Sequence, residues 1–115
     1  MKVIIALLST GKGTWTEVIN ILKSEEWNKI FIITNDFGKE KFSFPNVEFI
    51  ICDFNNSIDE IRASITEKLK GIPETEVAVN ISSGTGKEHT ALISAVLKAG
   101  LGPRLVYHDE VLREA

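Results

Sequence analysis

Five short apolar runs, separated by segments with helical periodicity, constrain the fold of this chain more than any other feature. The runs are rich in Val, Ile and Phe and nearly continuous, as is typical of strands buried on both faces. They cover 2–8, 29–34, 47–53, 76–81 and 104–107. The helical patterns cover 14–24, 57–70 and 87–99. This alternation predicts an α/β fold: a Rossmann-like, mostly parallel sheet with strand order 3-2-1-4-5 and helices on both faces.

The length and the remaining segments add detail to this prediction. The chain has 115 residues, which favours a single domain over 1–115. Ser57 followed by Glu60 is a capping-box pattern and predicts the start of the second helix. Residues 35–46 leave room for one short helix, and 109–114 predict a short helix or an extension of the sheet edge.

Composition argues against several classes of partner and cofactor. The net charge of −3 makes duplex DNA a poor candidate, and no apolar run approaches the roughly 20 residues that span a membrane. The single cysteine, Cys52, lies in an apolar run; it predicts a buried strand residue and fits a reducing cytoplasm. His89 and His108 lie far apart in sequence, so we expect no metal site.

Two loops rich in Ser, Thr and Gly, each with one lysine, follow the first and fourth apolar runs. They cover 9–14 and 82–87. In the predicted strand order the winding reverses between these strands, so the loops should meet there and form a ligand site. Amides at a helix start, hydroxyls and a lysine together favour phosphate. The alternative is that both loops are tight turns whose glycines serve backbone geometry and whose Ser and Thr cap helices. The candidate ligand-binding residues of the loops are Thr10, Gly11, Lys12, Ser82, Ser83, Gly84, Thr85 and Gly86.

Neither loop is a known nucleotide fingerprint. A Walker A loop would need Gly where Ile81 stands and Ser or Thr where Glu88 follows the lysine. A dinucleotide fingerprint would need a third glycine at Thr16. We therefore expect no nicotinamide or other cofactor. Asp36 and Asp53 follow strands, and we expect them to contact ribose or to point away from phosphate.

The third helix, 87–99, is apolar around most of its circumference. Such a helix must be buried on more than one face, and in a small domain the second covering surface can be another subunit. The pattern favours a homodimer through this helix. The alternative is that its alanines pack closely on the sheet.

Residues 79–93 resemble the signature of CRISPR-associated Rossmann-fold (CARF) domains, and the Ser9-Thr10-Gly11 loop fits this resemblance. Membership would imply a homodimer that binds cyclic oligoadenylates. Some members cleave the ring and are called ring nucleases. Because only 108–115 follow the last strand, the resemblance implies a standalone member with no fused effector.

The resemblance also implies roles for individual residues. The catalytic positions would be Ser9 or Thr10, together with Lys87, although Gly86 intervenes where the family commonly places lysine directly after Gly-Thr. A metal is not required, since the substrate 2′-hydroxyl is the nucleophile. Lys12 and Lys87 would pair with phosphates.

Two further side chains near the loops have open roles. Trp15 is a candidate for stacking on adenine, with a core position as the alternative. His89 is a candidate ligand contact, and we expect it to be a polar residue at the rim of the site rather than a general acid or base. The competing functions are a non-catalytic nucleotide-sensing or interaction module and an unrelated α/β enzyme for a phosphorylated metabolite.

Overall fold

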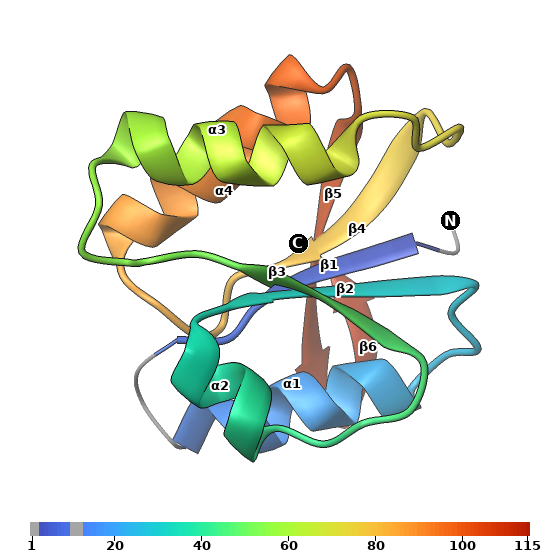
Figure 1. Ribbon diagram of the computed structural model, residues 1–115. Coiled ribbons are helices and arrows are strands. Elements are labelled where there is room, and N and C mark those ends of the chain that lie inside the picture. Colours follow the sequence, from blue (N-terminus) through green and yellow to red (C-terminus); the bar gives the residue numbers. More distant parts are fainter. Residues whose placement is uncertain (1–2, 10–12) are drawn as a thin grey trace.

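The computed structural model describes residues 3–9 and 13–115 as one layered α/β unit (Figure 1). The strands are β1 (Val3–Leu7), β2 (Lys29–Thr34), β3 (Val47–Ile51), β4 (Glu76–Asn80), β5 (Gly102–Asp109) and β6 (Val111–Glu114). The helices are α1 (Gly13–Lys23), α2 (Asp36–Lys41), α3 (Ile58–Leu69) and α4 (Gly86–Lys98).

The strands form one sheet with the order β3-β2-β1-β4-β5-β6. The first five strands are parallel, and β6 pairs antiparallel with β5. The predicted α/β fold and the order of the first five strands are confirmed. β1 lies between β2 and β4, so the direction of winding reverses between β1 and β4, where ligand sites of open α/β sheets form.

Helices cover both faces of the sheet. In Figure 1, α3 and α4 lie on one face and α1 and α2 on the other. Alternate residues of β1 point to opposite faces: Ile5 and Leu7 pack in the core beneath α3 and α4, and Ile4 and Ala6 pack in the core on the α1 side. All four are almost completely buried, which explains why the run is apolar without alternation.

The short helix and the last strand settle two open points of the sequence. Asn35 caps α2, because its Oδ1 accepts a hydrogen bond from the Gly38 N–H at 2.9 Å. The segment 111–114 extends the sheet edge rather than forming a helix. Arg104 holds this edge together: it donates to Glu114 at 2.6 Å and to Glu76 at 2.9 Å. These contacts raise the pKa of the guanidinium further above its usual value.

The remaining structural predictions concern Cys52 and the helix starts. Cys52 is buried, as predicted, and burial raises the pKa of its thiol to about 11. Ser57 and Glu60 form the predicted capping box at α3. No helix of the described ranges is both long and apolar enough to traverse a bilayer.

Candidate functional site

The ends of β1 and β4 form one continuous edge, where the two Ser/Thr/Gly loops meet. The backbone N–H of Ser9 donates to Ser83 Oγ at 2.9 Å. On the other side, the Leu8 N–H donates to the Ile33 carbonyl at 2.8 Å, which joins β1 to the end of β2. The structure therefore brings residues 9 and 83 together. Thr10, Gly11 and Lys12 lie outside the described residues, so their predicted ligand contacts stay predictions.

Asn80 positions the loop that follows β4. It is 1% exposed, and its Nδ2 donates to Ser82 Oγ and to the Val106 carbonyl, both at 2.9 Å. Its Oδ1 accepts from the Ser82 N–H at 3.3 Å. One buried amide thus ties the loop to β5. Sequence reasoning assigned Asn80 no role in the site, although an asparagine at the end of an apolar run is a recognisable signal.

A capping box occupies part of the start of α4. Thr85 is the N-cap, and its hydroxyl accepts from the Glu88 N–H. The Glu88 carboxylate accepts from the Thr85 N–H at 3.0 Å, and Glu88 is only 7% exposed. The N–H groups of Thr85 and Glu88 are therefore already bonded within the capping box, and the predicted ligand contact of Thr85 stays a prediction. The Thr-x-x-Glu spacing is the signal that was missed.

Two amides at this helix start remain available. Among the described residues, the Gly86 and Lys87 N–H groups have no hydrogen-bond partner. They occupy the first two helical positions, where N–H groups point out of the helix toward its positive end. A Cβ on Gly86 would meet no atom of the described residues within 4 Å, so there is open space beside this residue.

Gly84 shapes the turn between β4 and α4. Its φ of +101° lies in the left-handed region that favours glycine. A Cβ there would collide with the Leu7 side chain and lie 2.9 Å from Glu88 Oε1. Gly84 therefore serves backbone geometry, which is the alternative considered for the loop glycines, whereas no contact of this kind explains Gly86.

Lys87 and His89 extend from α4 in different directions. Lys87 Nζ donates to the Phe54 carbonyl at 3.0 Å and so reaches the loop that follows β3. His89 Nε2 lies 2.8 Å from the Ser83 carbonyl. Because a carbonyl only accepts, this nitrogen carries the proton. His89 is half-buried and braces the 82–85 loop, which agrees with the rim position and not with a free base.

Trp15 contacts the loop that follows β1. Its indole N–H donates to the Ser9 carbonyl at 3.1 Å, and its ring meets that of Phe42 edge-on at 6.1 Å. It packs against the core on the α1 side, which is the alternative to adenine stacking. Ser9 Oγ is buried and has no hydrogen-bond partner in the part of the chain that the structure describes.

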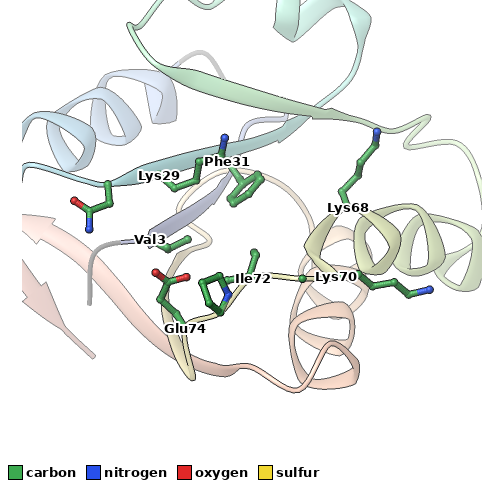
Figure 2. Close-up of a pocket in the computed structure, with 10 residues that line it drawn as sticks. Val3, Lys29, Phe31, Lys68, Lys70, Ile72 and Glu74 are labelled. Atoms are coloured by element: carbon green, nitrogen blue, oxygen red, sulfur yellow. The ribbon is translucent and has the colours of Figure 1, made fainter.

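A cavity of about 380 Å³ lies at the opposite edge of the sheet, where β1 and β2 begin (Figure 2). Val3 and Phe31 form its apolar floor, and three lysines surround it. Two of them are paired: Lys29 with Glu48 at 2.8 Å and Lys70 with Glu67 at 3.0 Å. Figure 2 shows Lys70 pointing away from the cavity. Most of the positive charge is therefore compensated, and this cavity is a weaker anion site than the β1/β4 edge.

Neither the search for metal-ligating side chains nor the comparison with known proteins identifies a function. Within residues 3–9 and 13–115, no group of three or more His, Cys, Asp or Glu side chains could hold a metal ion. No protein-family model matches the sequence, and a search of curated proteins finds no significant match. Function is therefore inferred from the site itself.

Proposed function

We propose that this protein is a CARF-like nucleotide-binding protein whose ligand is a cyclic oligoadenylate. The single observation that supports this most is the contact between Ser9 and Ser83, separated by 74 residues in the chain. It joins two hydroxyl-rich loops at the point where the sheet reverses its winding. Phosphate-bearing ligands bind at this position in open α/β sheets.

The chemistry of the edge suits a phosphodiester. The unpartnered N–H groups of Gly86 and Lys87 lie at the positive end of α4. The Lys87 side chain is exposed, and within the described part of the chain its hydrogen-bond partner is a neutral carbonyl. Exchanging that carbonyl for a phosphate oxygen would replace a neutral acceptor by a charged one, which gives a stronger hydrogen bond. The Ser82 hydroxyl, which is half-buried and accepts from Asn80 Nδ2, would be a further contact for phosphate or ribose.

A homodimer through α4 completes this proposal. α4 buries Ala91 and Leu92 in its own core, but Leu97 on its outer face is 58% exposed. A groove of about 370 Å³ runs along that face past His89, Ile93 and Leu97. His89 belongs both to this groove and to the site, so a partner seated on α4 would lie beside the ligand. A two-fold dimer would present the site twice, as a cyclic ligand with repeated phosphates requires.

Ring cleavage is the catalytic form of the same proposal. The ligand's 2′-hydroxyl oxygen would attack the adjacent phosphorus, and the bond from phosphorus to the 5′ oxygen would break. The 2′ proton must leave and the 5′ oxygen must gain one, which leaves a linear product with a 2′,3′-cyclic phosphate. Lys87 would stabilise the negative charge that develops on the non-bridging oxygens of the attacked phosphate. Ser9 Oγ, which has no hydrogen-bond partner among the described residues, would be the hydroxyl that positions the nucleophile.

Binding and cleavage are tested together with cyclic tetra-adenylate and cyclic hexa-adenylate. Calorimetry measures binding, and chromatography of the same mixtures detects linear products. Lys87→Ala should weaken binding roughly 10- to 100-fold, the range for losing a hydrogen bond to a charged group. Lys98→Ala is the matched control, because Lys98 lies exposed in the last turn of the same helix.

Each outcome has a defined meaning. Binding with conversion that Lys87→Ala abolishes supports a ring nuclease. Binding without conversion supports the non-catalytic sensing module. If neither ring binds at micromolar concentrations of protein, the proposal is wrong.

A further inference from the structure

A buried asparagine holds one serine of the candidate site in a defined orientation. Asn80 is the last residue of β4 and is 1% exposed. Its amide has two N–H groups and one carbonyl oxygen to satisfy. Two of its three hydrogen bonds end on Ser82, in the loop of the site, and the third ends on β5. The network therefore serves Ser82 as well as the packing of the strands.

The partners of the Asn80 amide fix which way it faces. The Val106 carbonyl only accepts, so the atom that lies 2.9 Å from it is the amide nitrogen. The Ser82 N–H only donates, so the atom that lies 3.3 Å from it is the amide oxygen. The second N–H of the same nitrogen is directed at Ser82 Oγ, at 2.9 Å. Ser82 Oγ is therefore the acceptor in this contact.

This contact leaves the hydroxyl proton of Ser82 for another group. A serine hydroxyl has one proton to donate and two lone pairs, and Asn80 occupies one of the lone pairs. Among the described residues, Ser82 Oγ donates to no acceptor. Because Ser82 is half-buried, part of its surface stays open to solvent. Its hydroxyl is thus a donor that is already oriented and has no acceptor in the described part of the chain.

The neighbouring serine has a different role. Ser83 is 0% exposed, and its Oγ accepts from the Ser9 N–H at 2.9 Å. This hydroxyl joins the two loops of the site and is closed to solvent. Of the two serines in the 82–85 loop, Ser82 is therefore the one whose side chain is available to a ligand.

The donors on this side of the site match one kind of ligand group. Lys87 contributes an ammonium group and lies in the first turn of α4, at the positive end of the helix. A phosphate oxygen accepts hydrogen bonds and carries charge, so it is a stronger acceptor for the Ser82 hydroxyl than a neutral oxygen. Hydrogen bonds in a chain also strengthen one another. Donation from Asn80 to Ser82 Oγ should therefore make Ser82 a better donor to phosphate.

We propose that Asn80 is a positioning residue for ligand binding, which acts by orienting the Ser82 hydroxyl as a donor to a phosphate oxygen of the ligand. The inference rests on the proposed function, which supplies the phosphate. It goes beyond the tie between the loop and β5, because it requires the effect of Asn80 on binding to disappear when the Ser82 hydroxyl is absent.

A double-mutant cycle separates this role from a structural one. Calorimetry measures the dissociation constant of cyclic tetra-adenylate for the wild type, Asn80→Ala, Ser82→Ala and the double variant. The measurements are made at a temperature where thermal melts show every variant to be folded. Ser64→Ala is the matched control, because Ser64 is exposed on α3; it should bind like the wild type.

Ser82→Ala should raise the dissociation constant about tenfold, the effect of losing a hydrogen bond to a charged group. Asn80→Ala should raise it about fivefold, and the double variant should bind about as weakly as Ser82→Ala, whereas independent effects would multiply to about fiftyfold. The melting temperature of the double variant should still lie below that of Ser82→Ala, because the bond to the Val106 carbonyl is lost as well. Binding effects that multiply, or an Asn80→Ala protein that binds like the wild type, overturn the positioning role and leave the proposed function intact. A wild type that does not bind the ring overturns both.

If the Asn80→Ala protein does not fold, NMR of the wild type answers the same question. The side-chain N–H signals of Asn80 should shift when cyclic tetra-adenylate saturates the protein, because a Ser82 hydroxyl that donates to phosphate becomes a stronger acceptor. The same signals should not shift in Ser82→Ala. Signals that stay unchanged in a wild type that binds the ring, or that shift equally in Ser82→Ala, overturn the positioning role.

Discussion

Asn80 holds the 82–85 loop of the candidate site against β5, so its removal should affect both the stability of the fold and the geometry of the site. It makes three hydrogen bonds: two from Nδ2, to Ser82 Oγ and the Val106 carbonyl, and one to Oδ1 from the Ser82 N–H. At about 1 kcal/mol each, Asn80→Ala should lower the free energy of unfolding by about 3 kcal/mol. For a chain of this length that corresponds to a melting temperature lower by roughly 10–15 °C.

The assay is a thermal melt followed by ligand binding at a temperature where every variant is folded. Asn20→Ala is the matched control, because Asn20 is exposed on α1; it should change stability by less than about 0.5 kcal/mol. Asn80→Asp should destabilise more than Asn80→Ala at neutral pH, since it buries a carboxylate next to the Val106 carbonyl. That difference should shrink as the pH falls and the carboxyl is protonated.

The folded Asn80→Ala protein should also bind cyclic tetra-adenylate more weakly than Asn20→Ala, because the 82–85 loop loses its tie to β5. Melting temperatures of Asn80→Ala and Asn20→Ala within about 2 °C of each other would refute this account of the loop.

Three further predictions test the turn, the buried thiol and the dimer. Gly84→Ala should lower the free energy of unfolding by about 1–3 kcal/mol through strain at positive φ, whereas Gly86→Ala should leave it unchanged or slightly higher. Denaturant unfolding measures both changes, and equal effects would contradict the roles of the two glycines. Burial keeps the Cys52 thiol protonated in the folded protein, so its contribution to the free energy of unfolding should be complete below pH 9 and be lost as the pH rises toward 11. Cys52→Ala should remove this component of the pH profile. Identical pH profiles of the wild type and Cys52→Ala would contradict this role of the thiol. Leu97→Glu should convert a dimer to a monomer in light scattering without lowering the melting temperature of the subunit, and a wild type that is already monomeric would exclude the α4 interface.

Much of the fold was predictable because burial on both faces leaves a mark on composition. The β1 run from Val3 to Leu7 is buried throughout, and the sequence shows it as an uninterrupted apolar segment. The strand order followed from right-handed crossovers and was confirmed for five strands. β6 was harder, because 111–114 is mostly exposed and its pairing depends on Arg104, in another strand.

The candidate site was predictable in location but not in detail. The loops were found from their composition, and the Ser9–Ser83 contact followed from the strand order. The role of Glu88 was available in the Thr-x-x-Glu spacing and was missed. The bond from Lys87 to the Phe54 carbonyl was not predictable, because nothing local relates residues 33 apart in the chain.

By itself, the sequence determined the five parallel strands, the three longer helices and the capped start of α3, since periodicity and capping act within a few residues. Only the tertiary structure decided which polar groups stay free. Among the described residues, the Asn80 amide is bonded to β5 and Lys87 Nζ to the Phe54 carbonyl, whereas Ser9 Oγ has no partner. The physical reason is that a hydrogen bond between distant residues exists only after the strands have been ordered side by side, and that ordering is a property of the whole sheet.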